Sequence, residues 1–225
     1  MGSKFGILAS TGNNIQTEGL MFYIDSSIKK SYPRTGTNVF NLASSSLTPT
    51  GSFINDTIYD SSTITPSYAF DGNGDRIQLI PNDLDFSSFT NGFTMSVWVK
   101  LGNNTQTGTY IYSRRNSANN NNIFSIIYGY VSQKYEIYNL SGLASQTLRT
   151  NSQITVSDTN WHNICYSVGS SARGYLDGIL ITDVSYGSTV TFSSSTGDNI
   201  IGDFGNGTND VYGNIGSFHV YNQVL

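Results

Sequence analysis

The sequence predicts an all-β protein in which two antiparallel sheets pack face to face, and three observations lead to this prediction. Apolar and polar residues alternate in short runs, which is the pattern of a strand with one buried face. Clusters of Gly, Asn, Asp and Ser, the residues that favour turns, separate these runs. An apolar pattern with the period of a helix nowhere continues over ~10 residues or more.

Length and composition agree with one such domain. The chain has 225 residues, and all-β sandwiches reach roughly 200–250 residues without splitting. Only 12% of the residues are charged, and Glu occurs only at Glu18 and Glu136, which excludes a coiled coil or a helical bundle. Aromatic residues make up 13%, which excludes a disordered chain. The net charge of −4 argues against nucleic acid as a partner.

The first half of the chain contains one long predicted strand and four short ones. Apolar residues at every second position from Phe93 to Leu101 predict a strand with a core face. The stretch Asn41–Thr65 lacks such a pattern, and we expect it to cross the edge of the sandwich as an irregular segment. The short strands are expected at Leu20–Ile24, Ser67–Phe70, Ile77–Ile80 and Tyr110–Tyr112.

The second half contains a hairpin signal besides three further predicted strands. In the run Gly174–Ile181, the dipeptide Asp177-Gly178 lies between two apolar arms. It predicts a hairpin with a type I′ turn, because such a turn needs positive φ at both central residues. Polar loops are expected at residues 102–108 and 117–122. The strands are expected at Phe124–Tyr130, Trp161–Val168 and Ile215–Tyr221.

Neither the cysteine nor the N-terminal residues suggest export. Cys165 is the single cysteine, so it cannot form an intramolecular disulfide, and its place within a predicted strand indicates a small buried side chain. The apolar run Phe5–Ala9 is too short for a signal sequence, and no run reaches the length of a membrane span. We therefore expect a protein made in a cytoplasm, with no membrane insertion.

Seven short motifs in a fixed order resemble the concanavalin A-like lectin/glucanase superfamily, and within it the laminin-G-like jelly-roll domains. The resemblance implies a concanavalin A-like jelly-roll domain over residues 19–225, preceded by a leader, residues 1–18, that could dock on a partner. The motifs are Gly19–Asp25, Lys30–Pro33, Phe70–Asp75, Phe93–Val99, Trp161–Tyr166, Tyr175–Ile179 and Ile215–Asn222.

The opening motifs, Gly19–Asp25 and Lys30–Pro33, are similar to the version of this domain found in tailed-bacteriophage structural proteins. This resemblance implies a virion component: a fibre, a tail appendage or a head decoration. Its partners would be other virion proteins, glycans of the host surface and, by analogy with phage appendages, two further copies in a trimer. The alternatives are a stand-alone carbohydrate-binding lectin and, more remotely, a glycoside hydrolase.

We expect no enzyme and no catalytic residues. Glucanases of the superfamily carry several acidic residues at alternate positions on one strand, and glycosidases need such paired carboxylates. Here Glu136 has no Asp or Glu within five residues, and Glu18 precedes the first predicted strand. Of the two histidines, His162 follows Trp161 and is expected to be hydrogen-bonded under a loop.

Calcium is the one cofactor for which the sequence offers ligands. Asp71 and Asp75 lie in one Gly-rich turn, and Asp203 and Asp210 bracket a second oxygen-rich loop. Ca²⁺ prefers six to eight oxygen ligands, and many members of the superfamily bind it at a rim of the sandwich. These four aspartates are therefore the predicted calcium ligands. The alternative stays open that Asp71 and Asp75 only form turns.

A cluster of tyrosines with a neighbouring arginine is the predicted glycan-binding site. Sugars are bound by aromatic faces and by planar polar groups, and both types gather between two Asn-rich loops. The alternative is that these side chains cover the sandwich faces or contact another protein. The predicted residues are Tyr112, Arg114, Tyr128, Tyr130 and Tyr135.

Overall fold

A computed structural model of the chain shows an all-β sandwich. Within the described residues, sixteen strands form two antiparallel sheets of eight strands each, and none of these residues belongs to an α-helix. The described part accordingly holds no helix that could cross a membrane. The structure describes residues 15–45, 48–62, 65–80, 84, 86, 89–102, 108–116, 122–138, 153–185, 197–204 and 209–225.

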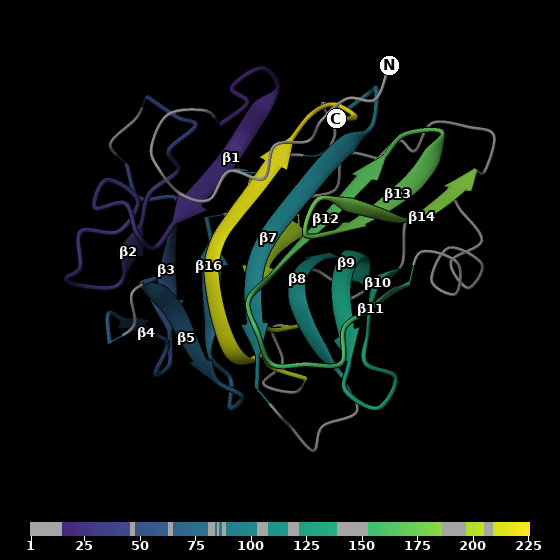
Figure 1. Ribbon diagram of the computed structural model, residues 1–225. Coiled ribbons are helices and arrows are strands. Elements are labelled where there is room, and N and C mark those ends of the chain that lie inside the picture. The colour runs from purple at the N-terminus through teal and green to yellow at the C-terminus, as the bar shows by residue number, and fades with distance from the viewer. Residues whose placement is uncertain are drawn as a thin grey trace.

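The first sheet has the strand order β14-β13-β12-β7-β16-β5-β4, and β1 also pairs with β16. The long strands β7 and β16 run side by side through its middle (Figure 1). Its strands are β1 (Leu20–Asp25), β4 (Ile58–Asp60), β5 (Ser67–Asp71), β7 (Phe93–Leu101), β12 (His162–Val168), β13 (Ser171–Leu176), β14 (Ile179–Ser185) and β16 (Tyr212–Tyr221).

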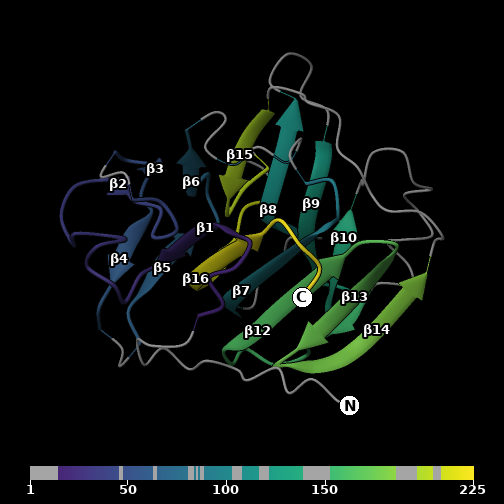
Figure 2. The ribbon, with the colours of Figure 1, turned by 90° about the horizontal axis from the view of Figure 1, so that it is seen from above.

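The second sheet has the order β11-β10-β9-β8-β15-β6-β3-β2. Figure 2 shows the two sheets as two layers, with β8, β9 and β10 in the layer opposite β7, β12 and β13. Its strands are β2 (Asn38–Val39), β3 (Gly51–Ile54), β6 (Arg76–Leu79), β8 (Thr109–Asn116), β9 (Asn122–Gly129), β10 (Lys134–Tyr138), β11 (Ile154–Thr155) and β15 (Gly197–Ile201).

Large apolar side chains from both sheets fill the space between the layers. On β7, residues Phe93, Met95, Val97 and Val99 have no exposed surface, as the alternating pattern predicts. Aromatic rings join the layers directly: the ring of Tyr112 on β8 stacks on that of Phe218 on β16, with 5.3 Å between the ring centroids. Such ring pairs add stability beyond the area that they bury.

The two strongest local predictions are confirmed. The strand predicted at Phe93–Leu101 is β7, with the same bounds. The predicted hairpin joins β13 and β14, and its turn residues Asp177 and Gly178 have φ values of 50° and 80°. Both are positive, as a type I′ turn requires. The two-sheet antiparallel fold class is likewise confirmed.

The prediction of an irregular crossing at Asn41–Thr65 is wrong, because this stretch contains β3 and β4. A glycine hides the pattern of β3: Gly51 occupies a core-facing position where other strands carry an apolar side chain. A Cβ atom there would lie 2.8 Å from the backbone oxygen of Gln78 and 2.9 Å from Leu79 Cδ2. The sequence therefore shows no alternation, although the strand has a buried face.

Several predictions fall on residues outside the described part. They concern most of the leader (residues 1–14) and most of the two polar loops, at residues 103–107 and 117–121. The division into a leader and a domain therefore stays a prediction.

We predict that Gly178→Val lowers the melting temperature by about 2–8 °C. A left-handed backbone costs a residue with a Cβ atom roughly 1–2 kcal/mol, and 1 kcal/mol shifts the melting temperature of a domain this size by about 2–4 °C. Thr182→Val on β14 is the matched control, since valine suits a strand. Calorimetry of the two variants provides the measurement, and equal melting temperatures would contradict the turn assignment.

Candidate functional site

Three residues of the predicted glycan platform belong to the core. The exposed fractions of Tyr112, Arg114 and Tyr135 are 0%, 3% and 2%. None of the three can touch a ligand outside the sandwich, so the prediction is wrong for them. The physical reason is that period-two alternation separates the two faces of a strand without telling which face points inward.

Arg114 is a structural arginine inside the sandwich. Its Nη1 atom donates to the backbone oxygen of Leu84 at 2.8 Å and to Asn199 Oδ1 at 3.2 Å. Its guanidinium also lies over the ring of Phe86, 5.2 Å from the centroid. The hydroxyl of Tyr112 donates to the same Asn199 Oδ1 at 2.7 Å. The Arg114 guanidinium thus has the hydrogen-bond acceptors that a buried charge requires.

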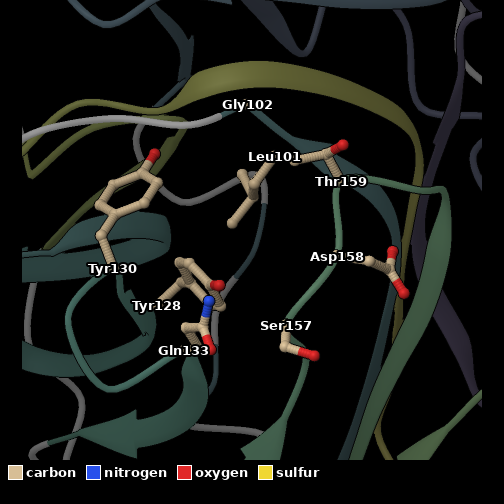
Figure 3. Close-up of a pocket in the computed structure, with 8 residues that line it drawn as sticks. All are labelled: Leu101, Gly102, Tyr128, Tyr130, Gln133, Ser157, Asp158 and Thr159. Carbon is tan, nitrogen blue, oxygen red and sulfur yellow. The ribbon is translucent and has the colours of Figure 1, made fainter.

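The other two predicted tyrosines lie at a small surface pocket of about 80 Å³ (Figure 3). Its lining comes from the end of β7, from the end of β9 and the turn that follows it, and from the segment between β11 and β12. Tyr128 and Tyr130 contribute the aromatic part. The described lining residues are Leu101, Gly102, Tyr128, Tyr130, Gln133, Ser157, Asp158 and Thr159.

The two tyrosines hold different places in the pocket. Tyr128 is 6% exposed and its hydroxyl donates to the backbone oxygen of Val156 at 3.0 Å. Tyr130 is half-buried, and its ring meets that of Tyr128 nearly at a right angle, with 5.2 Å between the centroids. Tyr128 therefore forms the floor, and the ring of Tyr130 remains accessible to a ligand.

Gln133 brings an amide to the same pocket from a strained backbone. Its φ of 54° is left-handed, which is uncommon for a residue with a side chain. Two hydrogen bonds fix this conformation: its N–H donates to Gly129 O at 2.7 Å, and its carbonyl accepts from Val156 N at 2.8 Å. Glycine would adopt this backbone without strain, so the side chain at this position carries a conformational cost.

The segment that closes the pocket on the other side is tied to β12 by a histidine. His162 Nε2 lies 3.0 Å from Asp158 Oδ1, and its Nδ1 lies 2.9 Å from Asp177 Oδ2. The same Asp158 oxygen accepts from Asn160 N at 2.7 Å, and Asp177 Oδ1 accepts from Asn163 N at 2.8 Å. The expectation that His162 is hydrogen-bonded under a loop is confirmed.

The pKa values of this group follow from the contacts. Burial lowers the pKa of His162, but the hydrogen bonds and charges of Asp158 and Asp177 raise it further, so that it ends above its ordinary value. The hydrogen bond from His162 holds the pKa of Asp158 below its ordinary value. The alternation of apolar and polar residues does not predict the cluster of Asp158, His162 and Asp177. These three residues lie in separate parts of the chain: a loop, a strand and a turn.

The second histidine and the cysteine lie in strands of the first sheet. The ring of His219 stacks on that of Tyr23 at 4.3 Å, and burial lowers its pKa to about 4. Burial raises the pKa of the Cys165 thiol to about 12. Both groups are thus uncharged at neutral pH.

Three of the four predicted calcium ligands meet where the β5–β6 turn contacts the loop between β15 and β16. Asp210 Oδ2 accepts from Gly74 N at 2.5 Å, and Asp75 Oδ2 accepts from Asp71 N at 2.8 Å. Asp203 Oδ2 lies 3.4 Å from Arg76 Nη1. The fourth, Asp71, is exposed, and its Oδ1 accepts from Asn73 N as in a turn.

One oxygen on each of the three buried carboxyl groups has no partner. These atoms are the Oδ1 atoms of Asp75, Asp203 and Asp210. Burial and the adjacent Asp203 raise the pKa of Asp210 to about 7. Even so, no three His, Cys, Asp or Glu side chains within the described residues converge as ligands of one metal ion. Calcium at this place stays a prediction.

The sequence was compared with family models and with curated proteins. A laminin-G-type model described as the concanavalin A-like lectin/glucanases superfamily matches residues 71–225. A search of curated proteins found no match to this chain.

Solved structures resemble this fold over nearly the whole chain. Domain 4 of AbnA, a GH43 extracellular arabinanase from Geobacillus stearothermophilus, in complex with arabinotriose, has a TM-score of 0.61 at 13% identity and covers 92% of this chain and 93% of that one. Trypanosoma rangeli sialidase in complex with the inhibitor DANA has a TM-score of 0.59 at 13% identity. That match covers 97% of this chain but only 33% of the sialidase, so the likeness concerns about a third of that protein.

These neighbours correct the prediction that the protein is no enzyme, because both structures belong to enzymes, an arabinanase and a sialidase. At 13% identity the likeness shows the fold alone, so it assigns no reaction to this chain. Carboxylates that are distant in the sequence also meet in this fold, because Asp158 and Asp177 contact the same imidazole from 19 positions apart in the chain (177 − 158).

We predict that Asp210→Asn raises the melting temperature at pH 8 by several degrees in the absence of metal ions. The carboxyl pKa rises from ~4 in the unfolded chain to about 7 in the fold. Its contribution to stability is therefore complete below about pH 4 and is lost as the pH rises to about 7. The amide stays neutral and still accepts from Gly74 N. Thermal unfolding between about pH 4 and pH 8 provides the measurement.

The same variant tests the calcium prediction. If the wild-type protein binds Ca²⁺ here, EDTA lowers its melting temperature by several degrees, and Asp210→Asn no longer responds to Ca²⁺ or EDTA. Asp60→Asn, at the end of β4, where the carboxylate accepts from Ser62, is the control. An unchanged wild-type melting temperature in EDTA and in excess Ca²⁺ would contradict calcium binding.

Proposed function

The chain belongs to the concanavalin A-like lectin/glucanases superfamily, and from this premise we propose that its domain binds carbohydrate at the pocket of Tyr130 and Gln133. The observation that carries the proposal is that an accessible tyrosine ring and a side-chain amide line one opening. The C–H face of a sugar packs on an aromatic ring, while an amide both donates to and accepts from hydroxyl groups.

The strain at Gln133 supports a binding role for its side chain. A left-handed residue other than glycine persists only where the surroundings fix it, and such residues cluster at ligand sites. Here two backbone hydrogen bonds fix it between the β9–β10 turn and Val156. The backbone of Gln133 is thereby fixed at the pocket before any ligand arrives, which reduces the ordering cost of binding.

The size of the pocket limits the ligand. Its volume of about 80 Å³ is well below the ~300–1,000 Å³ of sites that enclose a whole small molecule. We therefore expect one sugar ring to enter by an edge, as the end or a branch of a longer glycan. The arabinotriose bound by domain 4 of AbnA makes that trisaccharide the first ligand to try.

The setting that we propose for this binding is the surface of a bacteriophage particle. Its support is the resemblance of Gly19–Asp25 and Lys30–Pro33 to phage structural proteins. The protein would be a fibre, a tail appendage or a head decoration, assembled with other virion proteins or as a trimer, and the pocket would meet host glycans. Immunogold labelling of purified particles tests this setting independently of ligand binding.

We predict that Tyr130→Ala weakens glycan binding by about two- to thirteenfold, because an aromatic contact contributes about 0.5–1.5 kcal/mol beyond its buried area. Gln133→Gly should weaken binding without lowering the melting temperature, since glycine adopts the left-handed backbone freely. A glycan array followed by titration calorimetry with the strongest ligand, and with arabinotriose, provides the measurement. Tyr175→Ala on β13 is the control, and equal affinities for Tyr130→Ala and Tyr175→Ala would overturn the proposed site.

A further inference from the structure

The geometry points to His162 as a pH-dependent positioning residue: its imidazolium holds the segment 157–160 in place, so the pocket binds its glycan more tightly when His162 is protonated. This inference rests on the proposed carbohydrate binding, whose regulation it specifies. It is carried by the two carboxylates that face the two nitrogens of one ring.

The two carboxylates beside His162 require a proton on each nitrogen of its ring. Asp158 lies 3.0 Å from Nε2 and Asp177 lies 2.9 Å from Nδ1, so both nitrogens meet an acceptor. The imidazolium donates from both nitrogens, whereas the neutral ring has one N–H and one lone pair. A neutral His162 would therefore turn a lone pair toward one of the two carboxylates. Loss of the proton breaks one of the two hydrogen bonds and makes that contact repulsive.

The second step is that one of these hydrogen bonds secures a wall of the pocket. Ser157, Asp158 and Thr159 all line the pocket, and the side chains of this segment are exposed. Figure 3 shows the carboxylate of Asp158 turned away from Tyr128 and Gln133, on the far side of the segment from the opening. The Asp158 carboxylate thus connects the wall to β12 without entering the pocket.

The other partner of the ring is better anchored. Asp177 lies in the tight β13–β14 turn, and its second oxygen accepts from Asn163 N at 2.8 Å. Asp158 has a half-exposed side chain, and its further described contact, with Asn160 N, lies within its own segment. When only one N–H remains on the ring, the contact with Asp158 is therefore the one that opens.

The charged groups around His162 favour its protonated form. Asp158 from the preceding segment and Asp177 from the β13–β14 turn are the charges that shift its pKa, and both raise it. Strand β7 pairs with β12 opposite His162 through Val99, which is uncharged. On β13 and β14, Arg173 and Asp183 pair with each other. The proton therefore stays on His162 to a higher pH than on a free histidine.

Glycan affinity should fall as His162 loses its proton. Below the pKa of His162 both hydrogen bonds are made and the wall is held. As the pH rises through that pKa, the contact with Asp158 is lost, and we expect the affinity to fall about two- to fivefold, the range for an exposed ion pair. Binding is thus strongest at mildly acidic pH.

Asp158→Asn separates the proton from the contact. An amide accepts from the imidazolium through Oδ1, and after rotation it donates from Nδ2 to the lone pair of the neutral ring. The variant therefore keeps the wall in place in both states of His162, and its affinity should be the same from about pH 5.5 to about pH 9. His162→Gln should likewise lack the pH dependence. Asp183→Asn, on the exposed β14 strand, is the control and should follow the wild type.

The experiment has one arm without ligand and one with ligand. In the first, NMR follows the two imidazole rings and the backbone amides of residues 157–159 against pH; His162 is distinguished from His219, whose pKa is about 4. In the second, titration calorimetry measures binding of the strongest array ligand at about pH 5.5 and about pH 9.

Each outcome decides one of the two proposals. Amides of residues 157–159 that move with the His162 titration in the wild type, but not in Asp158→Asn, support the positioning role. Amides that do not respond, or an unchanged affinity across the pH range in the wild type, overturn it and leave carbohydrate binding standing. Absence of glycan binding at every pH, with responding amides, instead overturns the proposed function and with it the regulation.

Discussion

The inner faces of two sheets that lie about 10 Å apart must be filled without gaps, and the rest of this structure depends on that constraint. The strands of the second sheet meet it with rings, among them Tyr112, Phe124 and Tyr135, which have almost no exposed surface. Side chains that fill the core cannot also bind ligands. Tyr130 and Gln133 are not subject to this constraint, because they lie beyond the end of β9, in the turn that leads to β10.

The same packing explains how far the sequence predicts the molecule. Long strands such as β7 show their alternation directly, and the Asp177-Gly178 turn follows from backbone sterics alone. Strand β3 is hidden because Gly51 stands where the paired strand β6 leaves no room for a Cβ atom. In both successes the cause lies within a few residues, whereas the missed strand depends on a neighbour 28 positions away in the chain (Leu79 − Gly51).

The candidate site was predictable only in its aromatic half for the same reason. Tyr128 and Tyr130 belong to a strand and its end, so an alternating pattern points to them. The other half of the pocket comes from the segment 157–160, whose exposed polar residues resemble those of any loop. What gives the segment its place is the contact of Asp158 with His162 and the bond from Tyr128 to Val156, and neither has a local signature.

Buried polar groups divide into two kinds that the fold treats differently. Arg114 contacts a backbone carbonyl group, a side-chain amide and an aromatic ring, so it has partners inside the core and serves the packing of the sandwich. The carboxyl groups of Asp203 and Asp210 each keep one buried oxygen without a partner, and burial beside Asp203 raises the pKa of Asp210 to about 7. His162 lies between these cases, since its contacts are complete only while it carries a second proton. His162, Asp203 and Asp210 share one setting, because each lies at the end of a strand or in the turn beyond it, where the constraint of core packing is relaxed.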